Sequence, residues 1–207
     1  MSLLTMWGYT ADVNELPDLL TLDEFAEFTD DKYSKQEDRI AAEISAASAA
    51  VRNYVGWHLY PSTSCYTDMT MQDRRITRVG PDLLIQLPAK FLTAVTSVTV
   101  NGVNCAFTME TNGVLRCYDV PMAGVKRYST VHITYMAGLP DVMMAPIKEL
   151  IAHRVTHAMA VPSGITSEAS GGVSVTYNAS WINSAQSTTM QDANKELLAP
   201  FTLRGVF

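Results

Sequence analysis

The spacing of apolar residues changes from helical to strand-like near residue 65 and changes back near residue 137. From Ile40 to Val55, apolar side chains recur every three or four residues, which is the period of one face of an α-helix. Between about Cys65 and Met136 they alternate with polar residues, as in a half-buried β-strand. A chain of 207 residues therefore combines a helical part with a β part, which predicts the α+β fold class.

Four segments carry helix signals. Two of them begin with capping boxes, at Thr21 and Ser34, in which a hydroxyl and a carboxylate three residues later bind the free backbone N–H groups. A third begins at Pro146, because the first turn of a helix tolerates a missing N–H, and a weaker capping box precedes the fourth. The predicted helices cover residues 22–29, 35–56, 146–160 and 189–199. We expect these four helices to form a small α-helical core.

Two Asn-Gly pairs mark hairpins within the β region. Asn101-Gly102 and Asn112-Gly113 each separate two apolar-alternating runs, and both residues of such a turn accept a positive φ. The two consecutive hairpins predict an antiparallel β-meander, with further strands at 66–71, 83–87, 130–136 and 173–177. The predicted organisation is a helical core of residues 1–60 and 129–207, with a β-rich subdomain inserted at 61–128.

Acidic residues are concentrated near the N-terminus. The net charge is −6, and ten of the 21 acidic residues lie between Asp12 and Asp38. An acidic surface repels the phosphate backbone, so salt-sensitive nucleic-acid binding by the whole chain is not expected. A solvated helical face is the ordinary explanation of such a tract. The alternative of a nucleic-acid binder would rest on basic loops, which hold Arg74, Arg75, Arg78, Lys126 and Arg127.

Residues that could carry chemistry are few and scattered. His153 and His157 are four apart on a predicted helix, but the glutamate of an H-E-x-x-H zinc motif is missing. The three cysteines, Cys65, Cys105 and Cys117, have no metal-ligand spacing. We therefore expect no catalytic residue, no cofactor and no metal. An enzyme with an unrecognised site near His153 and His157 stays as an alternative.

The sequence shows no signal for a membrane or for secretion. No stretch reaches the ~20 apolar residues that a membrane span needs, and the N-terminus has neither a basic region nor a small-residue cleavage site. The odd number of cysteines suggests no disulfide framework. We expect a protein of the reducing cytoplasm, without a membrane contact.

The order of the elements and three short motifs resemble the head-tail connector (adaptor, head completion) proteins of tailed bacteriophages. The segments that carry the resemblance are LTLDEFAEF, AAEISAASAAVRNYVGWHL, VHITYMAGLP, PIKELIAHRVTHAM and LLAPFTLRGVF. The most specific motifs are A-x-x-x-V-x-N-Y-x-G-x-x-L (47–59), I-T-Y-x-A-G (133–138) and L-L-A-P-F-x-L-R-G-x-F (197–207). The chain departs from the compact members of this family in the longer meander between about Tyr60 and Tyr128.

The resemblance implies a structural protein of the virion neck and not an enzyme. It implies a homo-oligomeric ring, typically twelve-fold in that family, which docks beneath the portal protein and extends the DNA channel. Such a ring offers an attachment surface to the next neck or tail protein, and DNA passes through it without sequence-specific binding. The protein would be made in the cytoplasm of the host bacterium. The nearest alternative is another neck ring, a stopper or a tail terminator, but those proteins are usually mostly β.

Two sets of residues are candidates for this role. The apolar C-terminal segment can bury its side chains in a groove of the portal, or it can cover its own core. This candidate docking tail consists of Leu197, Leu198, Phe201, Leu203, Arg204, Val206 and Phe207. A neutral or repulsive channel wall avoids trapping a polyanion. The candidate channel-facing acids are Asp23, Glu24, Glu27, Asp30 and Asp31.

Overall fold

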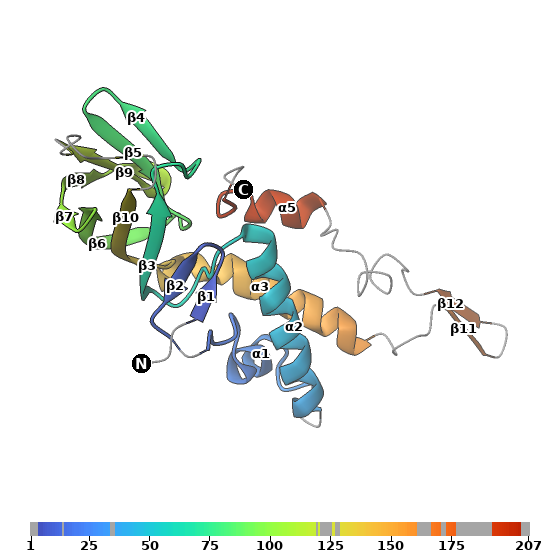
Figure 1. Cartoon of the computed structure of the whole chain (residues 1–207). Helices are drawn as coiled ribbons and strands as arrows, with labels where there is room; N and C mark the ends of the chain where they lie inside the picture. The colour runs from blue at the N-terminus through green and yellow to red at the C-terminus, as the bar shows by residue number, and fades with distance from the viewer. Residues whose placement is uncertain are drawn as a thin grey trace. The chain divides into compact units, whose positions relative to one another are not determined.

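The chain divides into two compact units, which are described separately here (Figure 1). The computed structural model describes residues 4–13, 15–33, 36–118, 120, 126, 129–160, 167–170, 173–176 and 192–203. The β unit consists of Met1–Pro17, Arg52–Val142 and Phe201–Phe207, and the helical unit of Asp18–Val51 and Met143–Pro200. This division differs from the predicted boundaries, because strands before residue 60 and after residue 129 pair with strands of the predicted insertion.

Helices at all four predicted places are present. They are α1 (Leu22–Phe28), α2 (Glu37–Val55), α3 (Asp141–Ala160) and α5 (Asp192–Leu198). The predicted capping box of α1 is confirmed: the Glu24 N–H donates to the Thr21 hydroxyl at 3.2 Å, and the Thr21 N–H donates to the Glu24 carboxylate at 2.9 Å. Ser34, the predicted cap of α2, lies outside the described residues. The α+β fold class is confirmed.

Helix α3 begins earlier than predicted. It starts at Asp141, so Pro146 lies inside the helix and not in its first turn. A proline in a helix removes the hydrogen bond to the carbonyl four residues earlier, which here belongs to Val142. Val142 is 82% exposed, so its surroundings are open to water. Proline is typical of the first turn of a helix, so the sequence alone indicates a start near Pro146 and not at Asp141.

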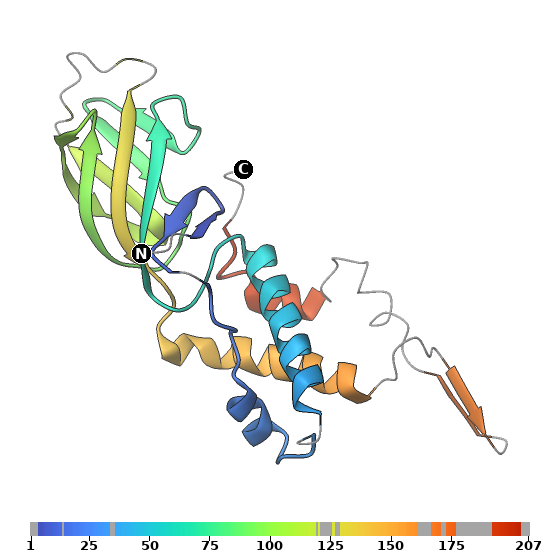
Figure 2. The same cartoon turned by 60° about the horizontal axis from the view of Figure 1, so that its bottom comes forward.

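The described strands of the β unit form two antiparallel sheets. The six-stranded sheet has the order β1-β2-β3-β10-β6-β7, and the four-stranded sheet has the order β4-β5-β9-β8. In Figures 1 and 2, β3, β10 and β6 lie side by side as long twisted strands. The bounds of the six-stranded sheet are β1 (Leu4–Met6), β2 (Tyr9–Ala11), β3 (Thr63–Thr70), β10 (Thr130–Ala137), β6 (Leu92–Val100) and β7 (Val103–Asn104). Those of the other are β4 (Ile76–Val79), β5 (Asp82–Gln86), β9 (Val114–Tyr118) and β8 (Ala106–Met109).

The predicted antiparallel strands are confirmed, but the chain changes sheet between the two hairpins. Asn101 and Gly102 have φ values of +50° and +78° in the turn between β6 and β7. Asn112 and Gly113, with φ of +60° and +76°, lie between β8 and β9 in the other sheet. Cys105, between β7 and β8, still donates its N–H to the Val98 carbonyl of β6. The predicted single meander therefore forms parts of two sheets, which local turn signals do not reveal.

The strands of the β unit bury alternate side chains, as their sequence predicts. In β10, Val131, Ile133, Tyr135 and Ala137 are all buried. Strand β10 ends where the chain passes close to Ser62. A Cβ atom at Gly138 would lie 2.3 Å from the Ser62 Cα, so only glycine fits there.

A buried hydrogen-bond network connects β2, β10 and the segment after α2. His58 is fully buried; its Nε2 lies 2.9 Å from the Ala137 carbonyl oxygen and its Nδ1 lies 2.6 Å from the Tyr9 hydroxyl. Because a carbonyl only accepts, Nε2 carries the proton and Nδ1 accepts from Tyr9. The Tyr9 oxygen in turn accepts the backbone N–H of His58 at 3.0 Å. The network is complete only with a neutral imidazole.

Two further strands, β11 (Ser167–Ser170) and β12 (Val173–Thr176), pair as an antiparallel hairpin in the helical unit. Strand β12 was predicted, and β11 was not. The rest of the polar segment 163–191 lies outside the described residues. Among the helices that the structure describes, none combines the length and the apolar character that a transmembrane span requires.

Candidate assembly site

The C-terminal segment crosses the end of α2 within the β unit. The Nε1–H of Trp57 donates a hydrogen bond of 2.8 Å to the carbonyl oxygen of Phe201. The Phe91 ring contacts both aromatic side chains, at centroid distances of 6.2 Å from Trp57 and 6.1 Å from Phe201. The N–H of Leu203 donates a 3.0 Å hydrogen bond to the Val55 carbonyl. This bond satisfies one of the carbonyl groups that the last turn of a helix leaves without a partner.

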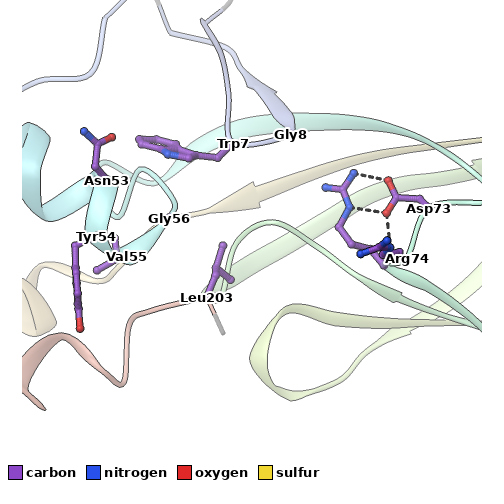
Figure 3. A pocket seen from close by; sticks show the side chains of 10 residues that line it. Trp7, Gly8, Asn53, Tyr54, Val55, Gly56, Asp73, Arg74 and Leu203 are labelled. Atoms are coloured by element: carbon purple, nitrogen blue, oxygen red, sulfur yellow. Dashed lines mark hydrogen bonds and ion pairs between the residues drawn. The ribbon is translucent and has the colours of Figure 1, made fainter. Parts of the chain in front are cut away.

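Leu203 lines an open cleft of about 720 Å³ in the β unit. Figure 3 shows Trp7, Asn53 and Gly56 around this cleft together with Leu203. The β1–β2 turn, the last turn of α2 and the β3–β4 connection all contribute to its lining. These segments are far apart in the sequence, so the cleft exists only in the folded unit.

Two neighbouring arginines at the cleft have different surroundings. Asp73 fixes Arg75, whose Nε and Nη2 atoms donate to the two carboxylate oxygens at 2.9 Å and 2.7 Å (Figure 3). These hydrogen bonds hold the pKa of Asp73 below its ordinary value. Arg74 is exposed, and its side chain has no hydrogen-bond or ion-pair partner within the part of the chain that the structure describes. Arg74 is thus a positive charge that an outside partner can reach.

The structure places the residues of the predicted docking tail in different environments. Leu198 is fully buried, while Leu197 is 37% exposed. Phe201 and Leu203 are half-buried and hold the contacts described above. The remaining residues, Arg204, Val206 and Phe207, lie outside the described residues. The part of the tail before residue 204 therefore already has a role in its own subunit.

Four of the five predicted channel-facing acids are exposed. Asp23 and Glu27 lie on α1, and Asp30 and Asp31 follow it with φ of +50° and +55°. Aspartate tolerates this left-handed backbone because its short side chain bonds locally. The five acids belong to the helical unit, which has 13 acidic and 6 basic residues, whereas the β unit has 8 acidic and 9 basic ones. The negative charge of the chain is therefore carried by the helical unit.

Glu24 is the exception among these acids, because it is half-buried and its carboxylate already accepts hydrogen bonds within the subunit. Its carboxylate accepts a short hydrogen bond from the Lys148 ammonium group of α3 and another from the Thr21 N–H. Partial burial acts to raise the pKa of Glu24, but the hydrogen bonds from Lys148 and Thr21 outweigh it and lower the pKa. Glu24 therefore joins α1 to α3 within the helical unit, and it is the least available of the five for contact with DNA.

The comparison with known families decides the kind of protein. A family model described as "Head completion protein" matches residues 18–186. The chain belongs to the head completion protein family. It is accordingly a structural protein of bacteriophage heads and necks and a component of the virion. None of the curated proteins compared with the chain matches it.

In this head completion protein, the residues weighed for catalysis are dispersed. His153 is exposed, with its ring edge-on to Phe28 at 5.1 Å and its Nε2 3.6 Å from Glu149. The three cysteines are free and buried, and burial raises the pKa of the Cys65 and Cys117 thiols to about 12. Within the described ranges, no group of three or more His, Cys, Asp or Glu side chains could hold a metal ion.

The basic residues of this head completion protein do not form one loop. Arg78 lies in strand β4, which was predicted as part of a basic loop, and Arg75 is paired with Asp73. Lys126 is exposed, and Arg127 lies outside the described residues.

The prediction missed β1, β2 and β4, and with β1 and β2 it missed the cleft. The sequence signal was the Trp7-Gly8 turn between two three-residue runs, which are too short for a pattern.

Proposed function

We propose that this head completion protein forms a ring that docks beneath the portal and extends the DNA channel. The ring then offers its other surface to the next neck or tail protein, and its role is mechanical, without covalent chemistry. The observation that carries the proposal is the family match over residues 18–186, which covers most of both units. Two separately packed units in one subunit support it, because a neck ring has to contact one protein above and another below.

The proposed docking element is the last part of the C-terminal tail. Leu198, Phe201 and Leu203 already have contacts in their own chain. We therefore assign docking to the residues after Leu203, with Val206 and Phe207 as apolar anchors. A large apolar side chain contributes about 1.5–3 kcal/mol when fully buried, and a ring repeats each anchor in every subunit. The ring as a whole therefore binds the portal tightly even if each single tail binds it weakly.

The proposed channel wall is the acidic surface of the helical unit. Asp23, Glu27, Asp30 and Asp31 are exposed and repel a polyanion, which keeps DNA from adhering as it passes. Replacing these four acids by lysine should slow DNA ejection, because the wall would then bind phosphates in a salt-dependent manner. Ejection measured by dye release from purified virions should recover at high salt. Unchanged ejection at low salt would place these acids outside the channel.

The ring proposal is tested by mixing the purified protein with portal rings of the same phage. Mass photometry should show one discrete complex whose added mass is a fixed multiple of the 22.7 kDa subunit. The protein alone is the control, because rings of this kind can assemble only on their template. A continuous distribution of masses, or no added mass at any concentration, would contradict the proposal.

A further inference from the structure

The four-stranded sheet of the β unit has two open edges. Among the described residues, β4 pairs only with β5, and β8 pairs only with β9. Proteins commonly block such edges with proline, lysine or a bulge, because free backbone groups recruit other strands. Neither ITRV in β4 nor AFTM in β8 contains a proline or a lysine, and their pairing registers are regular; the one charged side chain on them is Arg78 of β4. Cys105, just before β8, still donates its N–H to Val98 of β6 on the side away from β9, so within the described residues the edge of β8 is open from Phe107 onward.

The directions of the two edge strands are compatible with each other. Every neighbouring pair in the sheet β4-β5-β9-β8 is antiparallel, so β4 and β8 run in opposite directions. When a second copy is placed beside the first in the same orientation, its β4 therefore runs antiparallel to β8. This arrangement continues the hydrogen-bond pattern of the sheet.

The free backbone groups of the two edges also match. The N–H of Gln86 in β5 donates to the carbonyl of Arg75, just before β4, at 2.8 Å. By alternation, Ile76 and Arg78 of β4 direct their backbone groups to the open edge. Next to β8, the Glu110 N–H donates to the Val114 carbonyl at 2.8 Å, so residue 110 directs its backbone groups toward β9. By alternation, the backbone groups of Phe107 and Met109 point away from β9, to the open edge. If Ile76 of one copy pairs with Met109 of the next, and Arg78 with Phe107, the outward N–H and C=O groups of both strands find hydrogen-bond partners. Among the contacts of the described residues, the one group already used is the N–H of Ile76, which donates to the Asp73 carbonyl.

The side chains that meet in this register are complementary. On the face that packs inward, Met109 would lie beside the partner's Ile76, and Phe107 beside the partner's Arg78. On the other face, Thr108 would lie beside the partner's Thr77, and threonine pairs are favourable across strands. No like charges meet. Met109 is 48% exposed in the single subunit, so the contact would cover a large apolar side chain.

We propose that copies of this chain join edge to edge, with β8 of one copy paired to β4 of the next in this register. The inference rests on the proposed ring and names the contact that closes it. The contact uses two different surfaces of each subunit, so it propagates from copy to copy and closes when the rotation permits. The inserted sheets then form a continuous β-band around the ring. Two other contacts, β8 with β8 and β4 with β4, are the competing arrangements.

The test is a disulfide between copies, made with the double variant Thr77→Cys and Thr108→Cys. In the proposed register these positions form a non-hydrogen-bonded pair with Cα atoms about 4.5 Å apart, which suits a disulfide. Both threonines are exposed, and the substitutions remove only a surface hydrogen bond of 2.8 Å between the Thr108 and Tyr118 hydroxyls among the contacts that the structure describes. The fold should therefore stay intact, as thermal unfolding can verify. Assembled on portal rings and mildly oxidised, the variant should give a ladder of linked subunits on a non-reducing gel. The wild type should give none, because its three cysteines are buried.

Control variants distinguish the possible contacts. Each single variant alone should give no linked product, and an equal mixture of the two should stop at the dimer. Moving the second cysteine two positions, with Thr77→Cys and Ala106→Cys, should reduce linking at least about tenfold because the Cα atoms are then too far apart. Dimers of Thr108→Cys alone would overturn the inference in favour of a β8–β8 contact. If rings form on the portal but no linked subunits appear on the gel, the β8–β4 contact is wrong and the proposed function still stands. If no complex with the portal forms at all, the contact and the proposed function are both wrong.

Discussion

Removal of Arg204 to Phe207 is expected to abolish binding to portal rings while the subunit stays folded. Truncation after Leu203 keeps the hydrogen bonds that join Phe201 to Trp57 and Leu203 to Val55. It removes two apolar anchors per subunit, each contributing about 1.5–3 kcal/mol when buried. Because the ring repeats this loss in every subunit, the apparent affinity should fall by about a hundredfold or more. Binding is measured by mass photometry with a fixed concentration of portal rings.

Two matched variants separate docking from folding. Phe207→Leu keeps an apolar side chain and should retain most of the binding, whereas Phe207→Asp should lose it. A longer truncation that also removes Phe201 should lower the melting temperature, because the Trp57 indole N–H then has no partner. If the chain truncated after Leu203 binds portal rings as the full chain does, the tail covers its own subunit and does not dock.

Acid should destabilise the β unit through His58. Burial lowers the pKa of His58 to about 4, and the nearby Arg52 guanidinium acts in the same direction. The unfolded chain, whose histidine has a pKa of about 6.5, then binds the proton first as the pH falls. Stability is therefore complete above about pH 6.5 and is lost as the pH drops toward 4. The loss should approach about 3 kcal/mol, measured by urea unfolding at a series of pH values.

The carboxylates also titrate in this range, so the prediction concerns a difference between variants. His58→Gln retains an N–H for the Ala137 carbonyl but cannot be protonated, and its stability should vary less between pH 6.5 and 4 than that of the wild type. Tyr9→Phe removes the donor to Nδ1 and should destabilise the protein at neutral pH by about 1–3 kcal/mol. Parallel pH curves for the wild type and His58→Gln would show that His58 is not the titrating group.

Strong local signals in the sequence were sufficient for most of the elements. The capping box at Thr21 and the two Asn-Gly turns each determine their own conformation. The alternation in β10 predicted its buried face because one side of the strand packs on the core. Such features depend on residues that are close in the sequence, which is why a single sequence reveals them.

The candidate assembly site was less accessible to prediction, because it depends on contacts between distant segments. The bond from Trp57 to Phe201 joins residues 144 apart, and no local pattern indicates it. The sequence therefore left open whether the tail docks on the portal or covers its own core, whereas in the structure Leu203 and the residues before it contact their own subunit. The division of the β strands between two sheets was missed for the same reason, since it is decided by which strands meet across the core.

Cryo-electron microscopy of portal rings incubated with the purified protein would show directly whether the protein forms a ring beneath the portal. We expect a ring of density on the tail-facing side of the portal, into which the β unit and the helical unit fit separately, with a channel continuous with that of the portal. Its outer or inner face should show β8 of each subunit next to β4 of its neighbour. Portal rings without added density, or with single copies bound at irregular positions, would show that the protein does not form a ring beneath the portal.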